Sequence, residues 1–173
     1  MKNPTLLKFA LLVLACAFFS HSAKAQMDGP GATGRAQNVY FEAFGPGLTY
    51  SVNYDSRFNN TADGLGGRIG LGYFHQGGDQ FFSAPIAINY LLGKDGRFLE
   101  LGAGITYFNT NTDYPFVYNS NRVTKNGTIG TFNFGYRLQP IGGGLSFRAG
   151  LSPVLTSRTF APYWPYISFG YSF

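Results

Sequence analysis

Cysteine is nearly absent from this chain, and histidine is almost as rare. The only cysteine is Cys16, close to the N-terminus, and the two histidines are His21 and His75. If the N-terminal segment is an export signal, as argued below, the rest of the chain has no cysteine and only His75. Disulfide bonds and thiol chemistry are then excluded there, and the usual Cys and His ligands of a metal site are missing. We expect no metal and no cofactor.

Charged residues are also scarce. They make up 12% of the chain, where about a quarter is usual for a soluble domain, while 18% of the residues are aromatic and 24 are glycine. Three of the 13 Lys and Arg residues are Lys2, Lys8 and Lys24, which leaves ten basic against eight acidic residues in the remainder. So small a net charge gives no basis for a nucleic-acid partner. The composition is not typical of a soluble protein's surface.

Long apolar runs are missing after Gln26. A membrane-spanning helix needs roughly 18 or more consecutive apolar residues, and the chain beyond Gln26 has neither such a run nor a sustained helical period. This excludes a helical membrane protein.

The N-terminal segment has the pattern of an export signal. Lys2 and Lys8 precede a short apolar run at residues 9–19, and a small-residue site follows at residues 23–25. We therefore expect residues 1–25 to be a signal peptide that is cleaved after Ala25. Two alternatives are an uncleaved helical anchor, for which the run is short, and a lipoprotein site at Cys16, after which the chain is too apolar for the usual polar tether.

Apolar and polar residues alternate with a period of two through most of the remaining chain. The clearest case is residues 48–58, where Leu48, Tyr50, Val52 and Tyr54 are separated by polar residues. This period predicts strands with one apolar and one polar face. We expect eight of them, the smallest common number for a membrane barrel, at residues 39–44, 48–58, 65–74, 81–92, 99–107, 132–138, 145–151 and 167–173.

The connections support this count. Bacterial barrels place short turns in the periplasm and longer loops outside. The expected turns are residues 59–64, 93–96 and 139–144, and the expected external loops are 45–47, 75–80, 109–127 and 155–165. Residues 26–38 would then be a short periplasmic segment and residues 39–173 the barrel. An alternative remains at the first loop, because residues 45–47 are also compatible with a kink in one long strand and hence with seven strands.

The polar face of the strands decides between a membrane barrel and a soluble sandwich. In a sandwich the apolar faces meet in a core, whereas here the polar faces carry glycine, small residues and a few charges that suit a narrow barrel interior. Acid and base can pair there, so we interpret the charged set as a structural network rather than an ion pathway. Its members are Glu42, Asp55, Arg57, Arg68, Glu100, Arg137 and Arg148.

The last strand resembles the C-terminal strand of bacterial outer-membrane proteins. Residues 166–173 alternate apolar positions and end in Phe173. The chain as a whole resembles the outer membrane β-barrel domain family, with the size of the eight-stranded OmpA- and OmpX-type barrels. The resemblance implies an all-β, antiparallel, up-and-down barrel in the outer membrane of a Gram-negative bacterium. It also implies a monomer in lipid and lipopolysaccharide, with an assembly signal read by the barrel-assembly machinery at Ile167, Phe169, Tyr171 and Phe173.

Catalysis is not expected. Some barrels of this size modify lipid A with a His, a Ser and a carboxylate, and a cross-hairpin set of His75, Asp79 and Ser83 is the candidate for such a site here. No nucleophile motif surrounds the serine, however, so we interpret His75 as a polar loop residue. A lipid A-modifying enzyme and a narrow solute pore remain as alternatives, although eight strands leave little lumen.

The external loops are the other candidate site. Tyr114, Phe116 and Tyr118 alternate within the polar loop at residues 109–127 and are candidates for a binding edge above the membrane. Tyr163 and Trp164 suit either recognition or, as we favour, anchoring at the membrane interface. The sequence identifies no surface ligand. We therefore expect a non-enzymatic barrel with a structural or surface-interaction role.

Overall fold

A computed structural model describes residues 34–111, 125–157 and 159–173. The expected signal peptide and the loop aromatics Tyr114, Phe116 and Tyr118 lie outside these described residues. Within them, no helix is long and apolar enough to cross a membrane. The described chain is built from strands and one short 3-10 turn, η1, at Gly45–Gly47.

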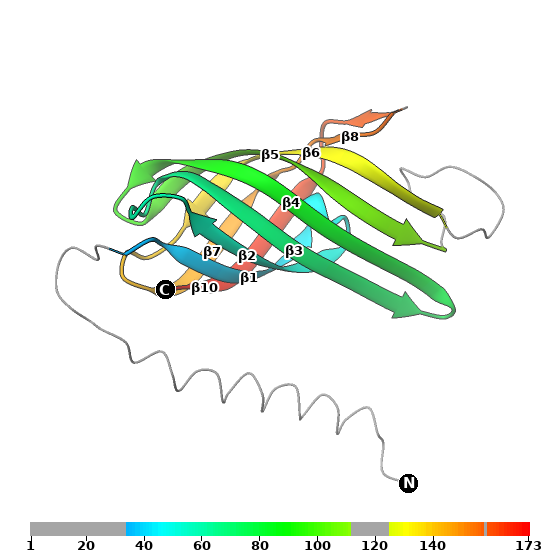
Figure 1. Cartoon of the computed structure of the whole chain (residues 1–173), viewed down its shortest axis with the longest axis horizontal. Coiled ribbons are helices and arrows are strands. Elements are labelled where there is room, and N and C mark those ends of the chain that lie inside the picture. The colour runs from blue at the N-terminus through cyan, green and yellow to red at the C-terminus, as the bar shows by residue number, and fades with distance from the viewer. Residues whose placement is uncertain (1–33, 112–124, 158) are drawn as a thin grey trace, which may run out of the picture. The chain divides into compact units, whose positions relative to one another are not determined.

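The long strands form one closed antiparallel ring (Figure 1). Each of the long strands pairs with the next one along the chain, including β5 with β6. The first strand, β1, pairs with the last, β10, and this closes the ring. This confirms the predicted eight-stranded up-and-down barrel. Its strands are β1 (Gln37–Phe44), β2 (Tyr50–Arg57), β3 (Gly64–Gln76), β4 (Asp79–Lys94), β5 (Arg97–Thr110), β6 (Lys125–Leu138), β7 (Gly144–Leu151) and β10 (Pro165–Ser172).

The two faces of the wall differ as the alternation predicts. Inward positions are buried, and they are filled by polar side chains and glycine over much of the ring. Outward positions are apolar and exposed, so the barrel is inverted relative to a soluble protein. Within the ring, closure pairs the backbone groups of neighbouring strands without leaving an open edge, which a hydrocarbon environment requires. Exposed outward residues include Val39, Phe41, Ile69, Leu71, Ile86, Ile88, Leu101, Ile105, Phe134 and Phe169.

The first hairpin departs from the expected pattern at Leu48. Residues 45–47 are a turn, because β1 pairs with β2 around them, so the seven-strand alternative is excluded. Leu48 was predicted to begin a strand on the apolar outer face, but β2 begins only at Tyr50. Leu48 instead has a φ of 69° and is buried, with 3% of its surface exposed. The left-handed backbone at this residue breaks the period of two and turns its side chain into the barrel mouth.

The predicted loop at residues 155–165 contains structure that the sequence did not indicate. Two short strands, β8 (Val154–Leu155) and β9 (Phe160–Ala161), pair with each other, and β8 also pairs with Gly130 and Thr131 of β6. Pro153 separates β8 from β7, since proline has no N–H to donate to the ladder. The wall is thereby extended beside β6 after the ring strand β7 has ended.

The inverted faces predict unequal costs for polar substitutions. Leu101 lies on the outer face and is 42% exposed, so Leu101→Arg would place a charge in hydrocarbon and lower the free energy of unfolding by about 2–4 kcal/mol. Thr131→Ser, on the buried inner face, is the control and should cost less. Urea unfolding of both variants in phospholipid vesicles measures the difference. Equal stability of the two variants would contradict this assignment of faces.

Candidate functional site: the closed lumen

Seven charged side chains of the described residues meet inside the barrel. They come from six strands, and each residue is at most 3% exposed. All seven occupy inward positions, because alternate residues of a strand share a face. The set comprises Glu42 of β1, Asp55 and Arg57 of β2, Arg68 of β3, Glu100 of β5, Arg137 of β6 and Arg148 of β7.

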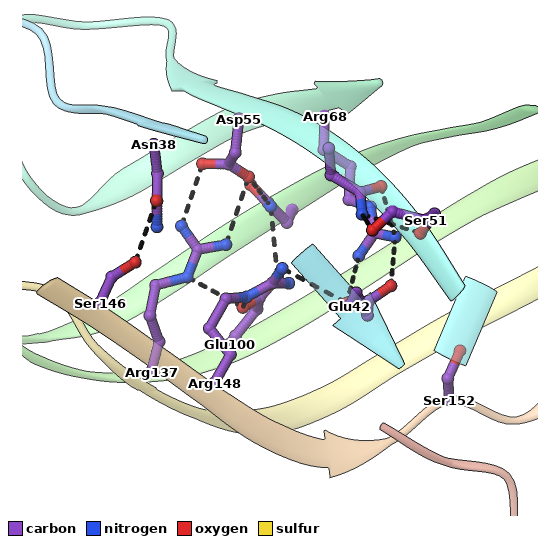
Figure 2. A network of polar contacts seen from close by, with 12 residues as sticks. Asn38, Glu42, Ser51, Asp55, Arg68, Glu100, Arg137, Ser146, Arg148 and Ser152 are labelled. Atoms are coloured by element: carbon purple, nitrogen blue, oxygen red, sulfur yellow. Dashed lines mark hydrogen bonds and ion pairs between the residues drawn. The ribbon is translucent and has the colours of Figure 1, made fainter. Parts of the chain in front are cut away.

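These side chains form a continuous series in which arginine and carboxylate alternate, and we call it the ionic chain (Figure 2). Each carboxylate lies between two arginines, and an arginine stands at each end. The nitrogen-to-oxygen distances are 2.6 Å for Arg57–Asp55, 3.0 Å for Asp55–Arg137, 3.0 Å for Arg137–Glu100, 2.5 Å for Glu100–Arg148, 3.4 Å for Arg148–Glu42 and 2.9 Å for Glu42–Arg68.

Neutral side chains add further hydrogen bonds to the ionic chain. Asn89 of β4 donates to Asp55 at 2.5 Å and to Glu100 at 3.3 Å, and its side-chain oxygen accepts from Arg57 at 2.5 Å. Gln139 accepts a hydrogen bond from Arg137 at 3.1 Å. Asn89 thus ties the two carboxylates together, and β4 takes part in the network although it supplies no charge.

Two buried tyrosines pack against the arginines at the other end of the ionic chain. The Arg148 guanidinium lies 4.2 Å from the centre of the Tyr40 ring and 5.6 Å from that of Tyr166, and Arg68 lies 5.9 Å from Tyr40. Contacts of this kind stabilise a cation that has lost its water. The sequence analysis did not single out either tyrosine, although both occupy inward positions of a strand whose outward positions are apolar.

The energetics of the ionic chain make every member dependent on the others. A buried charge without a partner is costly, and removing one partner of a buried pair costs about 3–5 kcal/mol. Four arginines face three carboxylates, so the carboxylates are the scarcer component. Glu100 illustrates this best, because its two oxygens accept hydrogen bonds from both Arg137 and Arg148.

The turn η1 folds into the barrel mouth and closes it from the loop side. Its three backbone carbonyls accept hydrogen bonds from side chains that are distant in the sequence: Gly47 from Ser83 at 2.9 Å, Pro46 from Thr106 at 2.8 Å and Gly45 from Trp164 at 3.0 Å. Leu48 packs beside the turn in an apolar cluster with Phe81, Phe108, Ile129 and Val154. We call this cluster together with η1 the plug.

The plug was not predicted from the sequence. Trp164 was interpreted as an interface anchor, but it is half-buried, packs against the plug and also meets the Phe44 ring edge-on at 6.1 Å. Tyr163 is 82% exposed, in keeping with either role considered for it. The sequence offered one signal for the plug. Ser83 and Thr106 are polar residues at inward positions near strand ends that are otherwise apolar, as expected of side chains that bond to a turn.

The candidate catalytic residues are not brought together. His75 pairs with Gln80 and Asp79 with Gln76 at the tip of the β3–β4 hairpin, whereas Ser83 pairs with Gly72 further down. Ser83 is fully buried and donates to Gly47, while His75 is exposed and three positions away from Gly72 on the opposite face. The described residues also contain no group of three or more His, Cys, Asp or Glu side chains suited to a metal ion.

The residues of the expected assembly signal lie on the outer face of the closing strand. Ile167, Phe169 and Tyr171 of β10 are exposed, as is Phe173 beyond its end. Phe169 contacts the ring of Phe147 on β7 at 5.1 Å between centroids. Their role in assembly remains a prediction of the sequence resemblance.

The ionic chain predicts that its carboxylates matter more than its terminal arginines. Glu100→Gln leaves two adjacent arginines short of a counter-charge and should lower the free energy of unfolding by about 3–5 kcal/mol. Arg68→Gln is the matched control, because Glu42 keeps its contact with Arg148. The control should lose less stability in the same urea titration. A larger loss for Arg68→Gln than for Glu100→Gln would contradict the proposed charge balance.

Comparison with proteins of known structure identifies the fold. No protein-family model matches the chain, and no curated protein matches it in sequence. The crystal structure of the N-terminal β-barrel domain of Pseudomonas aeruginosa OprF is similar, with a TM-score of 0.58 at 12% identity over 83% of this chain and 100% of that one.

Two further structures match less well. The Yersinia pestis outer membrane protein Ail, in a phospholipid bilayer nanodisc, gives a TM-score of 0.45 at 10% identity over 81% of this chain and 99% of that one. The outer membrane enzyme PagL gives 0.36 at 14% identity over 79% of this chain and 96% of that one. The similarity to the OprF domain, together with the closed ring, shows the fold of a small eight-stranded outer-membrane β-barrel.

Proposed function

We propose that this protein is an integral outer-membrane β-barrel with neither catalytic nor channel activity, whose role is structural or lies in contacts at the cell surface. The observation that carries the proposal is the closed lumen. The ionic chain and the plug fill the interior of the barrel. The outer wall and the loop end are then the surfaces through which the protein can act. We further propose that it is exported by a cleaved signal peptide, folded by the barrel-assembly machinery and monomeric in lipid and lipopolysaccharide.

The outer wall supports insertion into a membrane. It exposes a continuous set of Leu, Ile, Val and aromatic side chains around the ring, far more than a soluble domain leaves in contact with water. In the described part of the chain, charged residues lie mainly in the lumen and at the two ends of the barrel. The short turns at residues 95–96 and 140–143 would face the periplasm and η1 the cell exterior.

The lumen supports the absence of a channel. An open pore needs a continuous aqueous path, and the larger porins that have one use about twice as many strands. In this barrel the arginines and carboxylates contact one another directly across the interior rather than lining a gap. The plug adds an apolar layer at the loop end.

The loop end supports a role in surface contacts. β2 pairs with β3 only as far as Val52 and Leu71, yet β3 continues to Gln76. β4, β5 and β6 continue with it, since β5 and β6 remain paired up to Thr110 and Lys125. These four strands therefore rise beyond the rest of the wall as an open sheet (Figure 1). The β3 edge at Tyr73–Gln76 faces no partner strand in the described chain on the side away from β4, and such an edge can accept an added strand.

Conductance tests the closed lumen. The purified barrel in a planar lipid bilayer should give no current steps above the background of the bilayer, because the ionic chain and the plug leave no continuous water path. A porin measured in the same bilayer is the positive control. Stable channel openings of the unmodified protein would exclude the proposed function.

Adhesion tests the surface role. In a two-residue hairpin the closing pair, Gln76 and Asp79, exchanges its hydrogen bonds, so the backbone N–H of His75 points to the open edge. His75→Pro should therefore block strand addition without breaking the β3–β4 ladder, whereas His75→Ala leaves the edge N–H in place. We expect cells that display His75→Pro to lose adhesion to serum-protein-coated glass and those with His75→Ala to keep it.

Two outcomes would contradict the edge as the binding site. One is adhesion of His75→Pro cells equal to that of the unmodified protein. The other is loss in both variants, which would assign the effect to the imidazole. Lipid A mass spectra recorded on the same His75→Ala cells should be unchanged if the barrel is not a lipid A-modifying enzyme.

A further inference from the structure

The outer wall over β2–β5 contains a hollow of about 670 Å³. Its floor includes four outward residues at one level of neighbouring strands. Ser56 pairs with Gly67, Gly67 with Ile88, and Ile88 with Ala103. Three of these four positions carry a side chain smaller than those around them, so the wall is indented there. The volume is within the range of about 300–1,000 Å³ that is usual for small-molecule sites.

Large apolar side chains form the walls of the hollow. Tyr54, Phe58 and Ile69 lie beside the small residues, and both Phe58 and Ile69 are more than half exposed. The Phe58 ring leans over Gly67, where a Cβ atom would come within 3.2 Å of it. A flexible hydrocarbon chain can follow such an apolar surface, because burying methylene groups requires no directional contact.

Arg35 is the exposed cation at the border of this apolar hollow, since the other two lining arginines, Arg57 and Arg68, are buried members of the ionic chain. The backbone places Arg35 at the turn rim, by which we mean the end of the barrel that carries the short turns. The neighbouring Ala36 carbonyl accepts from the Arg57 N–H at 3.0 Å, and the Ala36 N–H donates to the Thr61 carbonyl at 3.5 Å. A guanidinium at the edge of the apolar band suits a phosphate, which it binds through paired hydrogen bonds. The apolar hollow and the cation together match the two parts of one phospholipid.

We propose that the hollow holds an acyl chain of one phospholipid from the periplasmic leaflet, with the lipid phosphate bound by Arg35. The inference rests on the proposed membrane insertion and on the turn rim facing the periplasm. Lipopolysaccharide would approach from the opposite rim, where η1 and the open sheet lie. We call this place the lipid seat.

Native mass spectrometry of the mature barrel, purified in detergent, tests the lipid seat with phosphatidylglycerol as the probe. The unmodified protein should retain one lipid. Ala103→Phe fills the hollow and should reduce the retained fraction about tenfold, as expected when one well-formed contact is lost. Ala149→Phe, on the outer face of β7 away from the hollow, is the matched control and should retain lipid as the unmodified protein does.

A second pair of variants tests the phosphate contact. Arg35→Gln should also lose about tenfold in retention, whereas Arg97→Gln removes the same charge from the same rim outside the hollow and should have no effect. Diacylglycerol with the same acyl chains, which lacks the phosphate, should be retained as weakly by the unmodified protein as phosphatidylglycerol is by Arg35→Gln.

Three results would overturn the lipid seat. They are equal retention by all variants, retention of diacylglycerol equal to that of phosphatidylglycerol, and preferential retention of lipid A. Circular dichroism of each sample separates these results from a failure of the barrel itself. A variant with the β-sheet spectrum of the unmodified protein and unchanged lipid retention contradicts the lipid seat alone, whereas a loss of β-sheet in the unmodified protein contradicts the proposed function.

Discussion

Closure of the backbone ladder between β1 and β10 is the constraint on which the rest of the structure depends. The two strands pair over seven residues, from Asn38 and Ser172 to Phe44 and Tyr166, and they convert a sheet with two edges into a ring. In hydrocarbon each unpaired backbone group would cost several kcal/mol, so a ring of this kind is stable there and an open sheet is not. Once the ring is closed, every inward side chain is confined to a small volume and every outward one must tolerate lipid.

The confined volume explains the chemistry of the lumen. Charged groups that are shut away from water must satisfy one another, and the alternating order of the ionic chain does this with each carboxylate shared by two arginines. Glycine on the inner face gives these long side chains room, as at Gly66, where an added Cβ would overlap the Arg57 guanidinium. The same filling supports the proposal that the barrel is not a channel. Under that proposal, the outer wall and the sheet that rises beyond the ring are the parts left for function.

Much of this could be predicted from the sequence, because a period of two assigns each residue to a face. The inward placement of Glu100, Arg137 and Arg148 follows from that period alone. Which carboxylate meets which arginine could not be predicted, because a contact such as Arg148–Glu100 joins residues 48 positions apart and depends on the registers of β5 with β6 and of β6 with β7 together. The period of two shows which face of the wall a residue occupies, but it does not show which residue of another strand its side chain contacts.

The remaining differences lie where the backbone leaves the regular strand. Leu48 was assigned to lipid because its neighbours alternate, and a left-handed φ at that residue reversed its direction. The short strands β8 and β9 carry no sustained alternation, and the upper part of β6 near Lys125 and Gly127 is too polar and too rich in glycine to indicate a strand. These segments are held by the plug and by neighbouring strands rather than by their own propensity.

The account as a whole depends on a closed ring folded in a membrane, and electrophoretic mobility tests this most directly. Protein extracted from outer-membrane fractions should migrate faster in an unboiled detergent gel than after boiling, because the closed hydrogen-bonded ring resists the detergent until it is heated. Recovery of the chain from the periplasm as a soluble protein without detergent, with the same mobility before and after boiling, would contradict the account.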